Sequence, residues 1–83
     1  MSTLTLDQIR VGTAFAVTTV DPPSNAPEWG QWLEDIGFIA GEQVMLIARA
    51  PLGGDPIVVR IGQSTFALRL AEAACVQLEA VNR

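Results

Sequence analysis

The side chains that could do chemistry are few in this chain of 83 residues. It contains nine Asp and Glu, five Arg and one Cys, and it has no His, Lys or Tyr. Transition-metal sites prefer imidazole and thiolate ligands, and acid–base catalysis near neutral pH most often uses His. We therefore expect no cofactor, no tight metal site and no enzymatic activity.

One thiol and one pair of carboxylates are the remaining candidates for a chemical site. Cys75 lies between Ala74 and Val76 at the start of an expected strand, so we expect it to be buried as a small apolar residue. Nothing nearby in the sequence would lower its pKa, which argues against a catalytic thiolate. Glu34 and Asp35 are adjacent on an expected helix, so their carboxylates should diverge.

The charge balance excludes several classes of partner. The formal net charge is −4, and the arginines are not clustered in the sequence. Nucleic acids and anionic membrane surfaces are bound by clusters of basic side chains, so neither is an expected partner. No apolar run approaches the ~18–20 residues that a membrane helix needs. A single cysteine and the lack of a secretory signal point to a cytoplasmic protein that contacts another protein.

An unusual turn joins two strand-like runs, residues 43–49 and 57–61. It reads Pro51-Leu52-Gly53-Gly54-Asp55-Pro56. Proline fixes φ and glycine supplies positive φ, so this segment, the 51–56 turn, should be rigid. Two interpretations stay open: Leu52 docks into a pocket of a partner, or it folds back onto the protein. We favour docking because no local rule requires Leu there. A phosphate-binding loop is excluded by the missing lysine and by the strand that follows.

The elements that must position this turn are mostly strands. β-Branched and aromatic residues at alternating spacing predict strands over residues 13–20, 43–49, 57–61, 65–68 and 75–81. Helical turns are expected in the lead-in, residues 4–9, and at residues 70–74. Five short strands with one helix after the first predict a mostly β domain over residues 1–83, folded as a small, partly closed barrel.

One helix is expected over residues 26–36. Asn25 is a candidate N-cap that Glu28 would complete as a capping box, and Gly37 is placed to end the helix in a left-handed conformation. Gly30 is interpreted as a close approach to the sheet. The apolar stripe consists of Trp29, Trp32, Leu33 and Ile36.

The two tryptophans leave a choice between core and recognition surface. We expect Trp32 to plug the barrel with Leu33, because aromatic residues at helical spacing usually pack inward. Two indoles are a large area for so small a barrel to cover. Trp29 is therefore a candidate contact for a partner or for a second copy, which leaves self-association open.

Three arginines are candidates for contacts with acidic groups of a partner. Arg49, Arg60 and Arg69 could converge near the mouth of the barrel, where guanidinium groups suit carboxylates. The alternative is that they are solvated and pair with Asp55 or Glu72. We favour the alternative for Arg60 and leave both open for Arg69.

Together these motifs resemble the FeoA family, the small SH3-like proteins of the bacterial ferrous iron transport system. The resemblance runs from about residue 6 to residue 78. One departure is that family helices commonly carry basic residues before the Leu-Gly pair, whereas here residues 26–36 carry only acidic charges. The residues that carry the resemblance are Val11-Gly12, Ile36-Gly37, Gly41, Val44, the 51–56 turn with Ile57 and Val59, and Phe66-Ala67-Leu68-Arg69.

The resemblance implies a five-stranded SH3-like barrel with an inserted helix. It also implies a cytosolic accessory role beside FeoB, the membrane GTPase-transporter for Fe(II), to which the protein would bind peripherally at the inner membrane. The 51–56 turn, Arg69 and Trp29 are the candidate contact residues. The alternative function is a regulatory or sensor module, since SH3-like modules of this type also resemble the C-terminal part of iron-dependent repressors.

Overall fold

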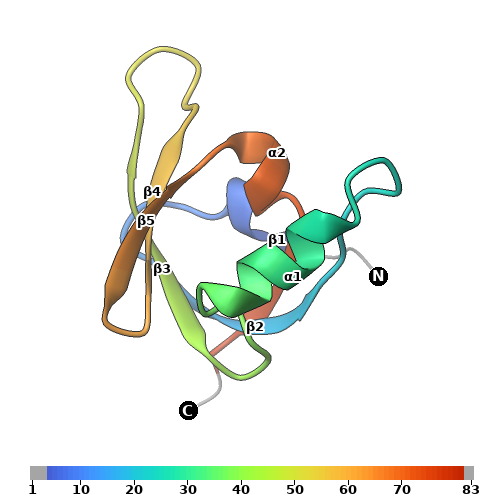
Figure 1. Cartoon of the computed structure of the whole chain (residues 1–83). Coiled ribbons are helices and arrows are strands. Elements are labelled where there is room, and N and C mark those ends of the chain that lie inside the picture. The colour runs from blue at the N-terminus through green and yellow to red at the C-terminus, as the bar shows by residue number, and fades with distance from the viewer. Residues whose placement is uncertain (1–3, 82–83) are drawn as a thin grey trace.

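The computed structural model describes residues 4–81, which form one sheet of six antiparallel strands with two α-helices and a 3-10 helix. The strand order in the sheet is β1-β6-β2-β3-β4-β5. Figure 1 shows the arrangement. The elements in chain order are β1 (Leu4–Thr5), η1 (Leu6–Gln8), β2 (Ala14–Val20), α1 (Glu28–Asp35), β3 (Gln43–Arg49), β4 (Ile57–Ile61), β5 (Ser64–Leu68), α2 (Leu70–Ala73) and β6 (Val76–Ala80).

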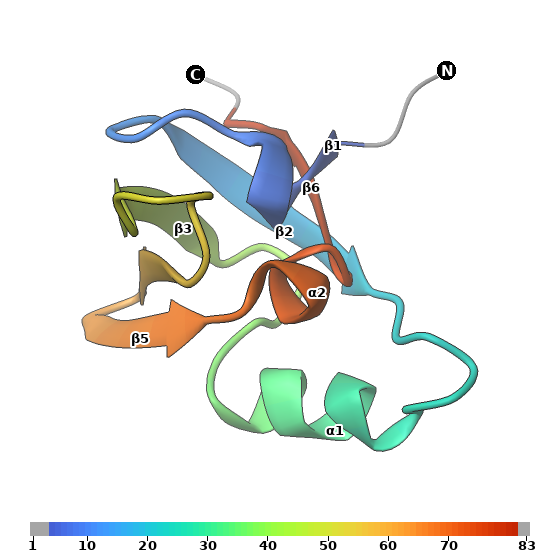
Figure 2. The ribbon, with the colours of Figure 1, turned by 90° about the horizontal axis from the view of Figure 1, so that it is seen from above.

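The sheet is strongly curved, and irregular pairing contributes to the curvature. The register shifts between Val17 and Thr19 where β2 pairs with β6, and between Leu46 and Ala48 where β3 pairs with β4. Such bulges bend the strand and increase its twist. As a result β1, β6 and β2 form one wall and β3, β4 and β5 form another, as Figure 2 shows. The expected mostly β fold with one main helix is confirmed.

The core lies between these walls and is built by alternation along the strands. In β4, Ile57, Val59 and Ile61 are buried, whereas Arg60 is exposed on the outer face. This is the alternation expected for a strand with one covered face. The core contains no charged or polar side chain among the described residues.

The helix α1 begins later than predicted, and its N-terminal cap is not the predicted one. Pro27 occupies the N-cap position and makes no side-chain cap, so Asn25 does not cap the helix. The amide of Trp29 instead donates to the carbonyl of Ala26 at 3.1 Å. A backbone turn at the start of the helix therefore takes the place of the predicted side-chain cap.

The C-terminal end of α1 is a Schellman motif. The amide of Gly37 donates to the carbonyl of Glu34 at 3.1 Å, and the amide of Phe38 donates to the carbonyl of Leu33 at 3.0 Å. Gly37 has φ of +123°, which confirms the predicted need for glycine. The motif turns the chain so that Phe38 enters the core, where it is fully buried.

Two further details differ from the sequence-based expectations. The lead-in contains the 3-10 helix η1, but the two-residue strand β1 ahead of it was not predicted, because two residues carry no periodicity. Gly30 makes a close approach to Pro22 of the loop after β2 rather than to the sheet. A Cβ at Gly30 would lie 3.0 Å from Cγ of Pro22.

Candidate partner-binding surface

The 51–56 turn projects from the end of the β3–β4 hairpin, at the top of Figure 1. Leu52 at its tip is 92% exposed, so it does not fold back onto the barrel. Gly53 and Gly54 have φ of +82° and +72°, which side chains other than glycine rarely adopt. The amide of Ala50 donates to the carbonyl of Pro56 at 3.0 Å and closes the base of the turn. The exposure that docking requires is present, and docking itself stays a prediction.

Asp55 ties the turn to the second helix. Its Oδ1 accepts a hydrogen bond from the backbone amide of Leu70 at 3.1 Å, at the first residue of α2. The first amides of a helix have no partner within the helix, so this carboxylate supplies one. Asp55 thus has a structural role inside the chain in addition to its place in the candidate contact surface.

Arg49 fixes the other side of the turn. Its Nη2 donates to the carbonyls of Asp7 and Ile9 at 2.9 and 2.8 Å, so the guanidinium holds the chain at and just after η1. The same side chain packs beside Gly54, where an added Cβ would lie 3.7 Å from Cδ of Arg49. Arg49 is therefore engaged within the protein as part of the scaffold of the turn.

The structure does not gather the three arginines at one mouth of the barrel. Arg60 lies on the outer face of β4, opposite Thr65 in β5. Arg69 follows Thr65 by four residues, so the two arginines lie near different ends of β5. Arg69 is exposed directly after β5, and its backbone amide donates to Oε1 of Glu72 at 2.8 Å. Two exposed guanidinium groups thus flank β5, whereas the third is part of the scaffold.

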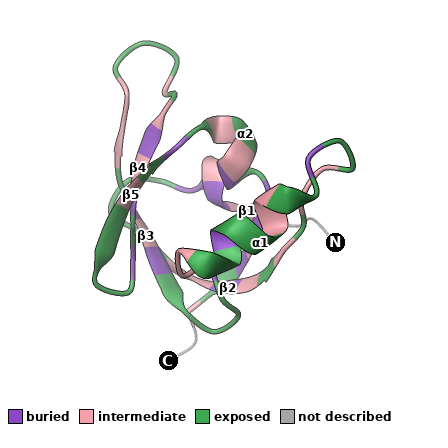
Figure 3. Ribbon diagram, in the orientation of Figure 1, coloured by how far each residue is buried: buried purple, intermediate pink, exposed green. Residues whose placement is uncertain are grey.

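The tryptophans of α1 take the opposite places from those predicted. Leu33 is fully buried as expected, but Trp32 is 40% exposed and does not plug the barrel. Trp29 is half-buried and packs against the core. Because Leu33 lies at the centre of the inward stripe, Trp29 and Ile36, one turn away on either side, also face the core, and Trp32 is rotated toward solvent. The exposed outer side of α1 is visible in Figure 3.

Cys75 is buried as predicted, with 4% exposure. Its Sγ lies 3.5 Å from the carbonyl of Ala71, to which it donates. Burial raises the pKa of the Cys75 thiol, and the carboxylates of Asp21, Glu72 and Asp7 raise it further. The thiol is therefore neutral at neutral pH, which is the reverse of what a catalytic cysteine needs.

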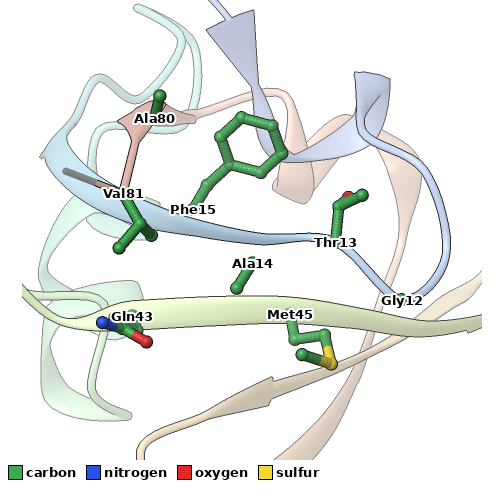
Figure 4. A pocket seen from close by; sticks show the side chains of 8 residues that line it. All are labelled: Gly12, Thr13, Ala14, Phe15, Gln43, Met45, Ala80 and Val81. Carbon is green, nitrogen blue, oxygen red and sulfur yellow. The ribbon is translucent and has the colours of Figure 1, made fainter. Parts of the chain in front are cut away.

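A shallow hollow lies where β2, β3 and the end of β6 meet, as Figure 4 shows. Thr13 and Gln43 supply its polar side chains, and no acidic, basic or thiol group from residues 4–81 lines it. Its surface can bind apolar or hydrogen-bonding groups, but it offers no residue for acid–base chemistry. The lining residues are Gly12, Thr13, Ala14, Phe15, Gln43, Met45, Ala80 and Val81.

No group of three or more His, Cys, Asp or Glu side chains is arranged to hold a metal ion within residues 4–81. Over the same residues, no helix has both the length and the apolar character needed to cross a bilayer.

We predict weak metal binding by the isolated protein. Fe(II), Zn(II) and Mn(II) would find only carboxylates and one buried thiol, which are poor ligands for selective transition-metal binding. Anaerobic calorimetric titration should show no site with affinity tighter than about 1 μM, the range in which binding is worth roughly 8 kcal/mol. A stoichiometric site below that concentration would contradict the prediction and indicate a metal sensor or carrier.

Comparison with known proteins identifies the family. The FeoA domain model matches residues 4–80. A search of the curated proteins gave no match. The FeoA of Stenotrophomonas maltophilia, solved in complex with zinc, is 33% identical over 92% of this chain and 89% of its own, with a TM-score of 0.84. That protein is described as a procaryotic SH3 domain protein and is suggested to act as a ferrous iron transport activating factor.

Other solved structures share the fold. The iron(II) transport protein A of Clostridium thermocellum is 31% identical over 94% of this chain and 46% of its own, with a TM-score of 0.82. A manganese-dependent transcriptional repressor is 21% identical over 95% of this chain and 42% of its own, with a TM-score of 0.78, and at this identity it shows the fold alone. The family match over residues 4–80 and the S. maltophilia structure together show that the chain belongs to the FeoA family.

Proposed function

We propose that this protein is a non-enzymatic accessory subunit of ferrous iron uptake that acts by binding the cytosolic part of a FeoB-type membrane GTPase-transporter. The FeoA family match and the activating role suggested for the S. maltophilia protein support this proposal. The protein would be cytoplasmic and would reach the membrane only through its partner. To regulate the transporter, it must bind one conformational state of the transporter more tightly than another.

The observation that carries the proposal is the exposed Leu52 on a restrained turn. Leu52 is the most exposed large apolar side chain among the described residues, at 92%. The turn beneath it is held by Arg49 on one side and by Asp55 on the other. A rigid segment loses little conformational entropy on docking, so the burial of one such side chain can contribute fully to affinity.

The proposal is tested by the substitution Leu52→Glu. We expect it to weaken binding to the purified cytosolic domain of the transporter by about 1–3 kcal/mol, because a charge replaces an apolar anchor. Calorimetry gives the affinity, and circular dichroism checks that the fold is intact. Val11→Glu is the matched control, since Val11 is 54% exposed at a different place and gains the same charge.

Two outcomes would contradict this assignment. Unchanged binding by a folded Leu52→Glu protein would exclude the turn as the docking site and direct attention to α1, where Trp32 is exposed on the outer face and Trp29 is half-buried. An equal loss with Val11→Glu would show that added negative charge, rather than the loss of Leu52, weakens the complex.

The second candidate function is a regulatory or sensor module related to the C-terminal domain of iron-dependent repressors. Its support is the shared fold with the manganese-dependent repressor. The metal titration described above distinguishes the two functions, because a sensor must bind its metal tightly enough to respond to it.

A further inference from the structure

The strand β5 forms one edge of the sheet. It is last in the strand order, and within residues 4–81 its ladder partner is β4 alone. Figure 2 shows β5 as the outermost strand of its wall. An edge strand presents a row of backbone N–H and C=O groups that no neighbouring strand satisfies, and these groups can pair with another extended chain.

This edge lacks the features that normally prevent such pairing. Natural edge strands carry lysine, proline, inward charges or bulges. β5 has the sequence Ser-Thr-Phe-Ala-Leu, without a charge or a proline, and it pairs with β4 in unbroken register from Ile57↔Leu68 to Ile61↔Ser64. Its backbone is therefore regular enough to accept an added strand.

Phe66 marks where a side chain of the added strand would lie. It is directly opposite Val59 on the inner face, and Val59 is fully buried. Phe66 is only half-buried and packs against the core, and within residues 4–81 no strand lies beyond β5 on this side of the sheet. A neighbouring strand would place an apolar side chain there, as cross-strand pairs do on one face of a sheet.

The charges around β5 determine which kind of strand fits. Residues 57–69 contain two arginines and no acid, although the whole chain has nine acids and a net charge of −4. Arg60 and Arg69 are both exposed. Alternation from Leu68, which is buried, places Arg69 on the outer face with Arg60. At the C-terminal end of β5, the carboxylates of Glu72 and Asp55 accept hydrogen bonds from the backbone amides of Arg69 and Leu70. The exposed guanidinium groups attract an acidic segment, and the attraction is stronger at Arg60, which lies opposite Thr65 and away from these carboxylates. A second copy would instead bring two arginine-bearing hairpins together.

We propose that β5 binds an extended peptide segment of a partner protein in which apolar and acidic residues alternate. The peptide adds as a seventh strand through backbone hydrogen bonds. Its apolar side chains cover Phe66 on the inner face, and its acidic side chains meet Arg60 and Arg69 on the outer face. This surface is separate from the tip residue Leu52.

The test uses a short acetylated and amidated peptide of alternating glutamate and valine as the probe. In an NMR titration, we expect shift changes at the β5 amides and slower hydrogen exchange there. Binding should be at least roughly tenfold tighter than that of the matched lysine–valine peptide, because only the first has complementary charge. A glutamate–valine peptide with N-methylated backbone amides should not bind, because it cannot form the ladder.

Variants of the protein test the charges independently. The double substitution Arg60→Glu and Arg69→Glu should weaken binding of the glutamate–valine peptide by roughly tenfold or more. Arg10→Glu, an exposed arginine outside this hairpin, should change it by less than about twofold. Leu52→Glu should leave peptide binding unchanged, which separates this proposal from the proposed docking of the turn.

Three results would overturn the proposal. The first is equal binding of the lysine–valine peptide, and the second is a set of shift changes that map away from β5. The third is a concentration-dependent change at the β5 amides without any peptide, which would show that a second copy occupies this edge.

Discussion

Replacing Leu33 by Ala is expected to lower the free energy of unfolding by about 2–5 kcal/mol. Leu33 is fully buried and belongs to the main core cluster, so the shorter side chain would leave a cavity beneath α1. The loss combines the missing apolar burial with the contacts that its neighbours can no longer make. Urea unfolding followed by circular dichroism measures it, provided that the slope against denaturant is unchanged.

Trp32→Ala is the matched control on the same helix. Trp32 is 40% exposed, so its removal should cost clearly less than the removal of Leu33, although its ring is larger. A loss below about 1 kcal/mol for Leu33→Ala would mean that α1 is not part of the core. The helix would then be a surface element, free to move when a partner binds.

Replacing Arg49 by Met is the second change with a large expected effect. It removes two hydrogen bonds from a charged donor to the carbonyls of Asp7 and Ile9. Hydrogen bonds to charged groups contribute about 1.5–3 kcal/mol each. Because Arg49 is half-buried, water can reach the two carbonyls in the variant and replace part of the lost interaction. We expect a loss of about 2–4 kcal/mol in the free energy of unfolding. Thermal and urea unfolding would measure it.

Arg60→Met is the control for Arg49→Met. Arg60 is exposed on the outer face, so the same substitution should change stability by less than about 0.5 kcal/mol. Faster hydrogen exchange at the amide of Ala50, which closes the turn, should accompany Arg49→Met. Equal effects of the two substitutions would show that the contacts of Arg49 with the η1 region contribute nothing to the fold.

The sequence alone predicted the elements with clear periodicity. The strands β3 and β4 have the predicted bounds, residues 43–49 and 57–61, and Ile57, Val59 and Ile61 all face the core. Strand alternation is a local property that needs no knowledge of partners. Gly37 was placed correctly for the same reason, since a helix end of this kind requires positive φ.

Features that depend on distant parts of the chain were missed or misplaced. Arg49 donates hydrogen bonds to carbonyls that are 40 and 42 residues away in the sequence, and no local sequence pattern predicts such a contact. Trp29 faces the core and Trp32 is exposed, which is the reverse of the prediction. Which of them is buried depends on how α1 is rotated against the sheet, and this rotation is set by the position of Leu33 in the core. The predicted cap at Asn25 was wrong because the helix starts later, with Pro27 at the N-cap position, and its first turn is closed by the backbone bond from Trp29 to Ala26.

The anchorage of the 51–56 turn joins parts of the chain that are far apart in sequence. Arg49 reaches the η1 region near the beginning of the chain, and Asp55 reaches Leu70 in α2 near its end. These two segments also contact one another, so the contacts form a closed ring beneath the tip. A force that a bound partner exerts on Leu52 would therefore be transmitted to both η1 and α2. Local unfolding of either η1 or α2 would increase the mobility of the 51–56 turn, although the six residues of the turn would be unchanged.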